Sequence, residues 1–169
     1  MKGEAARRFA GSLLLLAAAL VALGSCGFKL RGSERLPFDT IYLGFGVNSA
    51  LGAELARNIR AGTSTRVVTD RAAAEAILEV LSESREREIL SVNAQGRARE
   101  FTLRYLFTFR LHDGKGRELI APTQIALARD VAFNESQILA KEAEEALLYR
   151  DMQSDLVQQV LRRIAAVRG

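Results

Sequence analysis

Residues 98–112 read AREFTLRYLFTFRLH and carry the most regular pattern in this chain of 169 residues. The odd positions hold the large apolar and aromatic side chains Phe101, Leu103, Tyr105, Phe107, Phe109 and Leu111. The even positions hold mostly polar side chains, namely Thr102, Arg104, Leu106, Thr108, Arg110 and His112. A strict period of two is typical of a β-strand with one buried and one polar face. We therefore expect a strand whose odd face is buried under helices.

Two similar strands flank this one. Residues 76–92 precede it across an Asn-Ala-Gln-Gly turn, and residues 118–132 follow it across an Asp-Gly-Lys-Gly turn. Turns of this composition are typical of β-hairpins. Pro122 has no N–H to donate, so its strand is predicted to lie at a sheet edge or to carry a bulge. A further strand is expected at residues 40–45, where β-branched and aromatic side chains cluster.

A first helix is predicted between the strand at residues 40–45 and the long strands. Asn48 is suited to be its N-cap, and Gly62 to end it. Leu51, Leu55 and Ile59 recur at four-residue steps, which indicates one apolar side. Val67 and Val68 then form a short extended piece, and residues 72–76 are too short to make a stable helix alone.

A second, longer helix is predicted from Asn134, which makes a capping-box-like start with Gln137, to about Val167. Its apolar stripe consists of Leu139, Ala143, Ala146, Tyr149, Met152, Leu156, Val160, Ile164 and Val167. These spacings indicate a helix that covers the odd face of the central strand. The expected fold is an α+β two-layer sandwich. Two α-helices pack on one face of a four-stranded, mostly antiparallel sheet in the order β-α-β-β-β-α.

The N-terminal 25 residues resemble a secretory signal. Basic residues such as Lys2 and Arg8 precede an apolar run over residues 13–23, which is too short to span a membrane. Leu-Gly-Ser-Cys at residues 23–26 resembles the bacterial lipobox, so we expect Cys26 to carry an S-diacylglycerol and an N-acyl chain, commonly palmitate. The alternative is an ordinary signal followed by a chance cysteine.

The mature chain is expected to have a lipidated tether at residues 26–37 and one domain at 38–169. The tether is either a solvated linker or a segment that docks on a partner. Gly27, and not aspartate, follows the anchor; by resemblance to lipoprotein sorting signals, this favours the outer membrane over retention in the inner one. Without the signal, 21 basic residues face 19 acidic ones, so the charge gives no argument for nucleic-acid binding. With Cys26 lipidated, one chain cannot form a disulfide.

The sequence offers no recognisable catalytic, metal or cofactor site. His112 is the only histidine and has no orienting acid beside it in sequence, so a surface role is favoured over catalysis. The Gly-Lys-Gly at residues 114–116 lacks the spacing of a phosphate-binding loop. Gly44-Phe45-Gly46 lacks the third glycine of a dinucleotide fingerprint. We expect a protein that is not an enzyme and that uses no cofactor.

Arginines gather around the predicted strand turns, at Arg85, Arg87, Arg97, Arg99, Arg104 and Arg110. Guanidinium groups suit anions with several oxygens, such as phosphate. For a membrane-tethered exported protein, the available polyanions are lipid headgroups, above all lipopolysaccharide (LPS). The alternative is scattered solubilising charge. Lys141 joins these arginines only if the fold brings it near.

Three stretches together resemble the LPS-assembly lipoprotein LptE family, whose members partner the outer-membrane translocon LptD. They are CGFKLRG at residues 26–32, SVNAQG at 91–96 with Glu100 and Phe101, and LAKE at 139–142 leading to RDM at 150–152. The resemblance covers essentially the whole mature chain. No single motif is diagnostic, but their order and the predicted order of helices and strands match together.

The resemblance implies two helices on a four-stranded sheet and a place inside the LptD β-barrel as a plug, on the periplasmic side of the outer membrane. It also implies help in barrel assembly and LPS binding through basic residues. Lys141 matches the family's lysine, whereas Ala94 stands where some members carry arginine, so Arg97 and Arg99 are the replacement candidates.

Arg104, Arg110 and His112 on the polar strand face are the candidates for contact with the inner wall of the barrel. The alternative function is that of a stand-alone, periplasm-facing lipoprotein that binds anionic lipid.

Overall fold

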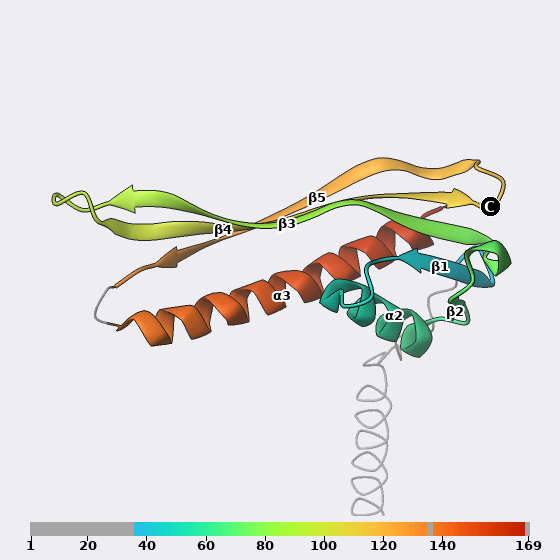
Figure 1. The fold of residues 1–169 in the computed structure, drawn as a ribbon, viewed down its shortest axis with the longest axis horizontal. Helices are drawn as coiled ribbons and strands as arrows, with labels where there is room; N and C mark the ends of the chain where they lie inside the picture. Colours follow the sequence, from blue (N-terminus) through green and yellow to red (C-terminus); the bar gives the residue numbers. More distant parts are fainter. Residues whose placement is uncertain (1–35, 135–136, 168–169) are drawn as a thin grey trace, which may run out of the picture. The chain divides into compact units, whose positions relative to one another are not determined.

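The computed structural model describes residues 36–134 and 137–167, which belong to one compact unit, Ser33–Gly169. The predicted signal peptide, Cys26 and most of the predicted tether lie outside the described residues. The elements, in chain order, are β1 (Thr40–Gly44), α2 (Ala50–Gly62), β2 (Arg66–Val68), a 3-10 turn (Arg71–Ala73), β3 (Ala76–Val92), β4 (Ala98–Asp113), β5 (Glu118–Ala132) and α3 (Ile138–Ala165). Figure 1 shows both helices on the same side of the sheet.

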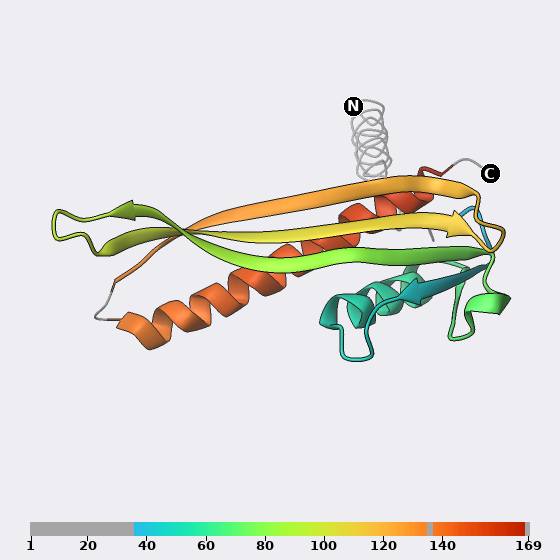
Figure 2. The same ribbon diagram turned by 45° about the horizontal axis from the view of Figure 1, so that its top comes forward.

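The sheet has five strands in the order β2-β1-β3-β4-β5, so the prediction of four strands is wrong by one. The additional strand is β2, which contains Val67 and Val68 and pairs in parallel with β1 over three residues. β1 also runs parallel to β3, whereas β3, β4 and β5 form an antiparallel meander. The two-layer α+β class is as predicted. Figure 2 shows the three long strands side by side, with α3 crossing obliquely behind them.

The prediction for the central strand is confirmed from Leu103 to Leu111, whereas Phe101 is only partly buried. Leu103, Tyr105, Phe107, Phe109 and Leu111 are all fully buried, beneath the two helices. β5 is an edge strand, and its register with β4 shifts between Phe109 and Leu111, opposite Pro122. Pro122 therefore lies both at an edge and at a bulge, where no ladder hydrogen bond from its nitrogen is needed.

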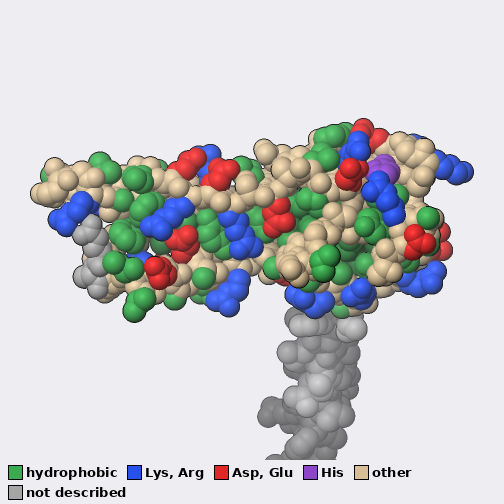
Figure 3. Space-filling model, viewed as in Figure 1, with side chains coloured by type: hydrophobic (Ala, Val, Ile, Leu, Met, Phe, Trp, Pro, Cys, Tyr) green, Lys and Arg blue, Asp and Glu red, His purple; other side chains and the backbone are tan. Residues whose placement is uncertain are grey.

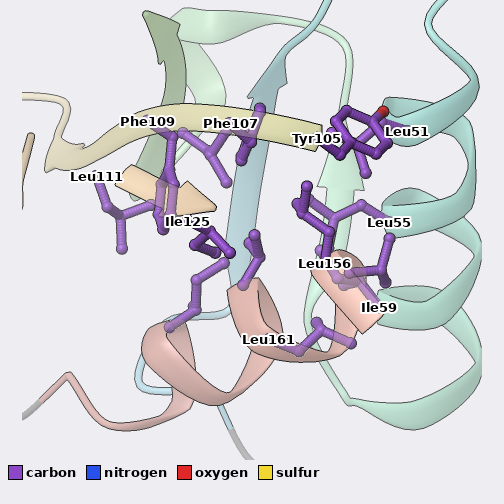
Figure 4. Packing of buried hydrophobic residues seen from close by; sticks show 14 of the residues in the cluster. Leu51, Leu55, Ile59, Tyr105, Phe107, Phe109, Leu111, Ile125, Leu156 and Leu161 are labelled. Atoms are coloured by element: carbon purple, nitrogen blue, oxygen red, sulfur yellow. The ribbon is translucent and has the colours of Figure 1, made fainter. Parts of the chain in front are cut away.

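The two helices meet the odd face of β4 over only part of its length. Leu51, Leu55 and Ile59 of α2 are buried against it, as predicted from their spacing. The N-cap of α2 is Ser49 rather than Asn48, because the Ser49 hydroxyl accepts from the Gly52 N–H. Figure 4 shows these side chains together with Phe107, Phe109 and Leu156 in one continuous apolar core.

The N-terminal half of α3 differs from the prediction. The helix begins at Ile138, after a Gln137 cap residue whose side chain makes no capping hydrogen bond, so the predicted start at Asn134 is wrong. Its buried residues are Met152, Gln153, Leu156, Val157, Val160, Leu161 and Ile164. The predicted stripe residues Leu139, Ala143 and Ala146 are exposed. At this end, β3 faces the helix layer with Arg85 and Arg87 rather than with aliphatic side chains.

We therefore distinguish two parts of the described chain. The arm comprises residues 82–104, 128–134 and 137–151, which form the far end of the β3–β4 hairpin, the end of β5 and the start of α3. The body comprises the other described residues, including all of α2, β1 and β2. In Figure 1 the arm extends to the left of α2, and only α3 accompanies the sheet there.

Candidate functional site

The tip of the arm is the β3–β4 turn. The Asn93 N–H donates to the Arg97 carbonyl at 2.8 Å, and the Gly96 N–H donates to the Asn93 carbonyl at 2.9 Å. The Asn93 side-chain oxygen also accepts from the N–H groups of Gln95 and Arg97, at 3.0 and 2.9 Å. Gly96 has a φ of 76°, a conformation that favours glycine. These bonds hold the backbone of Arg97 in a defined turn.

Two β-bulges follow directly behind the turn, one on each strand. The register passes from Ile89 opposite Phe101 to Ser91 opposite Glu100, which leaves Leu90 as an extra residue in β3. It then passes to Val92 opposite Ala98, which leaves Arg99 as an extra residue in β4. Bulges redirect side chains out of the regular pleat and are over-represented next to functional sites. The leucine and the arginine that they release are both exposed.

The base of the arm is held by Arg87, which lies on the helix-facing side of β3. Its guanidinium carbon lies 3.7 Å from the ring centre of Phe101 and 5.5 Å from that of Phe133, and these two rings meet edge to face at 5.2 Å. Its Nη1 lies 3.4 Å from a carboxylate oxygen of Glu145 on α3. Arg87 therefore connects the sheet to the start of α3, where the sequence had suggested an anion-binding group.

Lys141 lies in the first turn of α3 beside the same cluster. With Arg87, Phe101, Phe133 and Glu145 it lines a cavity of about 10 Å³, room for about one water molecule. Its Nζ lies 2.7 Å from a carboxylate oxygen of Glu144, and its side chain is 21% exposed. The amine therefore has an acidic neighbour that a bound anion would have to displace or share.

The three predicted LPS-binding residues all lie in the arm. The Phe133 N–H donates to the Arg99 carbonyl at 2.7 Å, so Phe133 connects the strand that carries Arg99 to the cavity that Lys141 lines. Arg97 lies farther out, at the turn, and both arginines are exposed. The fold thus brings Lys141 to the arginine-bearing end. In Figure 3 basic and hydrophobic side chains adjoin one another at the left, arm end of the molecule.

A polar network marks the junction of arm and body. The Arg85 guanidinium donates to the Tyr105 hydroxyl at 3.2 Å and to the Gln153 side-chain oxygen at 3.0 Å. The Tyr105 hydroxyl donates to Glu83 at 2.6 Å, and the Gln153 amide donates to Glu54 of α2 at 2.6 Å. Burial of Tyr105, helped by the hydrogen bond to Glu83, raises the pKa of its phenol to about 12. Arg85, like Arg87, therefore has a structural position that sequence reasoning missed.

The predicted partner-facing residues lie on the sheet face that carries no helix. Arg104 forms an ion pair with Glu88 at 3.1 Å. Arg110 forms one with Glu79 at 2.6 Å, and its hydrogen bond lowers the pKa of the Glu79 carboxyl. His112 lies beside this pair, with its Nε2 3.6 Å from Glu79. This face is polar but locally balanced in charge.

His112 has contacts that suit a structural position better than a catalytic one. Its Nδ1 lies 2.7 Å from the Asp113 carbonyl oxygen, which can only accept, so Nδ1 carries a proton. Its Nε2 lies 3.5 Å from the Arg71 guanidinium. Among the residues that the structure describes, no group of three or more His, Cys, Asp or Glu side chains could hold a metal ion. Within the same residues, no helix is long and apolar enough to cross a membrane.

Comparisons with known proteins give one consistent result. The family described as "LptE: Lipopolysaccharide-assembly" matches residues 38–164. A protein of Photorhabdus laumondii named LPS-assembly lipoprotein LptE is 27% identical over 159 residues, covering 91% of this chain and 85% of that protein. One of Yersinia pestis with the same name is 31% identical over 162 residues, covering 91% and 75%.

Solved structures agree in fold. Lipoprotein B of Nitrosomonas europaea is 42% identical, with a TM-score of 0.72, and the match covers 83% of this chain and 91% of that one. Rare lipoprotein B of Shewanella oneidensis shares the fold at 23% identity, with a TM-score of 0.64 over 75% of this chain and 94% of that one.

Proposed function

The chain belongs to the LPS-assembly lipoprotein LptE family, and we propose that it is the partner of an LptD-like outer-membrane β-barrel. In this role it fills the barrel as a plug, supports its assembly, and binds LPS through basic residues of the arm. The observation that carries the proposal is the family match, which spans body and arm without interruption. As an outer-membrane lipoprotein of LPS assembly, the chain acts where such a barrel works.

The polarity of the sheet face that carries no helix supports the proposed role as a plug. The inner wall of a large outer-membrane barrel is polar, and its lumen is filled with water unless something occupies it. Arg104 and Arg110 each have a cross-strand carboxylate, and the Thr102 hydroxyl donates to Asp130 at 2.7 Å. Such a face can meet a polar wall without leaving an unpaired charge behind. His112 extends the same polar face to the body end of the sheet.

The tip supports LPS binding. Arg97 and Arg99 are exposed beside a turn that is fixed by backbone hydrogen bonds, so little ordering is needed to present them. Lys141 lies at the same end of the molecule. Phosphate groups accept paired hydrogen bonds from guanidinium groups, and an amine adds a point charge.

Recovery of the barrel tests the partnership. The full chain is isolated from detergent-solubilised outer membranes through a C-terminal affinity tag. We expect one large β-barrel protein in stoichiometric amount. Recovery of the chain as a free monomer at full yield would contradict the plug. If that monomer still bound LPS, the stand-alone anionic-lipid lipoprotein would be the better description.

A second experiment tests the basic residues. We compare LPS binding by the full chain in non-ionic detergent before and after the triple substitution Arg97→Ala, Arg99→Ala and Lys141→Ala. The matched control removes the same charge from exposed body positions, with Arg57→Ala, Arg60→Ala and Lys115→Ala. We expect the arm variant to lose roughly tenfold or more in affinity, a change of about 1.4 kcal/mol or more, and the control to lose much less. Equal losses would mean that only net charge matters.

A further inference from the structure

The arm exposes hydrophobic side chains that its own fold does not use. Six of the eight exposed large hydrophobic residues among the described ones lie in the arm, at Ile89, Leu90, Val92, Ile138, Leu139 and Leu147. The body has only Val47 and Leu81 of this kind. Single exposed hydrophobic residues are ordinary, but a concentration at one end indicates a surface that something covers.

Three of these residues stand within four positions of β3, directly behind the tip. Ile89, Leu90 and Val92 are 62%, 53% and 56% exposed. Ser91, between them, donates from its hydroxyl at 2.6 Å to Glu100, the exposed acid opposite it on β4. An exposed aliphatic run at the end of a hairpin is a liability for aggregation, so a protein keeps it where it has a use.

The aliphatic run of β3 and the two arginines at and after the turn, Arg97 and Arg99, lie on adjacent strands, and each strand carries a bulge. Leu90 is the extra residue of β3, and Arg99 is the extra residue of β4, on either side of the Ser91–Glu100 pair. A regular ladder would alternate these side chains between two faces, whereas a bulge on each strand redirects one leucine and one arginine. The result is a tip at which exposed aliphatic side chains and exposed arginines stand on adjacent strands, with the Ser91–Glu100 pair between them.

This combination of chemistry selects the occupant. A surface that is apolar and basic suits an acylated, phosphorylated glycolipid, whose chains need apolar contact and whose phosphates need cations. We propose that Ile89, Leu90 and Val92 contact the acyl chains of LPS while Arg97 and Arg99 contact its phosphates. The inference rests on the proposed function and adds to it a contact for the acyl chains of LPS, which the basic residues do not bind.

The test separates acyl chains from phosphates. The full chain, in a fixed concentration of non-ionic detergent, is titrated with intact LPS and with fully deacylated LPS that keeps its phosphates. The tip variant is Ile89→Thr, Leu90→Ser and Val92→Thr, which keeps β-branched residues in the ladder positions. The control is Val47→Thr and Leu81→Ser, which changes the two exposed hydrophobic residues of the body.

We expect the unaltered chain to bind intact LPS roughly tenfold or more tightly than deacylated LPS. The tip variant should lose most of this difference, with unchanged affinity for the deacylated form, and the control should behave as the unaltered chain. Leu90→Ser alone, at the position outside the ladder, should give a smaller loss of the same kind. If the triple variant fails to fold, Leu90→Ser alone takes its place in the test.

Four outcomes would overturn the inference. Equal binding of intact and deacylated LPS by the unaltered chain would remove the acyl contact while the phosphate contact stood. A tip variant that keeps its LPS affinity but no longer recovers the barrel would assign the aliphatic run to the protein partner. Binding to phosphatidylglycerol vesicles without LPS that is as tight as binding to intact LPS, and that the tip variant loses, would assign the aliphatic run to the membrane. Binding to neither form of LPS would remove the proposed LPS binding as well.

Discussion

The two halves of α3 pack against different surfaces of the same sheet. From Met152 onward the helix buries seven side chains against β4 and α2, whereas residues 138–151 include no buried side chain. The body thus has an apolar core closed by two helices, and the arm has one helix and a thin interior. The comparison indicates that the body supplies most of the stability and that the arm is free to carry exposed groups for binding.

The physical difference begins on β3. At the body end, Ala76, Ile77 and Leu78 are buried. Farther along, the helix-facing positions carry Arg85 and Arg87, whose guanidinium groups lie against the rings of Tyr105 and Phe101 at 4.6 and 3.7 Å. Long basic side chains cover aromatic surface with their stems and keep their charged ends near water. The strands and the helix of the arm are therefore joined by contacts that are individually weak and partly exposed to solvent.

The largest expected effect concerns the body. Phe107 is fully buried and stacks near Phe45 and Phe109, with ring centres 5.8 and 5.5 Å apart. Phe107→Ala should lower the free energy of unfolding by about 3–5 kcal/mol, as large-to-small core substitutions do. Urea denaturation measures the change. Phe101→Ala in the arm is the matched control and should cost clearly less. Equal losses would mean that arm and body share one core.

A smaller effect concerns the junction and depends on pH. The pKa of Tyr105 is raised from 10.0 to about 12, so the folded state holds this proton more tightly than the unfolded chain does. This difference in pKa raises the free energy of unfolding by up to about 3 kcal/mol. The stabilisation is complete below pH 10 and is lost as the pH rises to about 12. Tyr105→Phe should remove that part of the alkaline loss of stability, measured by urea denaturation at pH 9 to 12. Parallel curves for the two proteins would contradict the assignment.

The smallest effect concerns the arm. Arg87→Met keeps the apolar stem and removes the contacts to Phe101, Phe133 and Glu145. The free energy of global unfolding should fall by about 1 kcal/mol or less, because exposed cation–π and ion-pair contacts are worth little each. Amide hydrogen exchange should accelerate in β3 and β4 of the arm and stay unchanged in α2. Faster exchange in both parts would show that the arm does not open separately.

The sequence predicted the antiparallel part of the sheet well because its signals are local. The alternation along β4, the glycine turns and Pro122 each depend on neighbouring residues only. β2 was not predicted as a strand because its three residues are a strand only through parallel pairing with β1, which is not adjacent in sequence. The start of α3 was misplaced because helical spacing shows an apolar stripe but not whether a surface faces it.

The sequence suggested the candidate residues Lys141, Arg97 and Arg99 but not how they are arranged in space. The position of Lys141 near the arginine-bearing hairpin required the fold, since about 40 residues separate them. Arg85 and Arg87 could not be separated from Arg97 and Arg99 by composition, because only packing shows which guanidinium groups lie on aromatic rings. The bulges at Leu90 and Arg99 are differences in register between two strands, and no single-strand pattern reveals them.

The continuity of α3 has a consequence for how a partner could position the tip. The helix runs without a break over 28 residues, about 40 Å at 1.5 Å per residue, with its last turns fixed in the body and its first turn in the arm. It therefore sets a fixed distance between the body and the tip of the arm. A partner that binds the body also determines how far from that contact the tip lies, and the number of residues in α3 sets this distance.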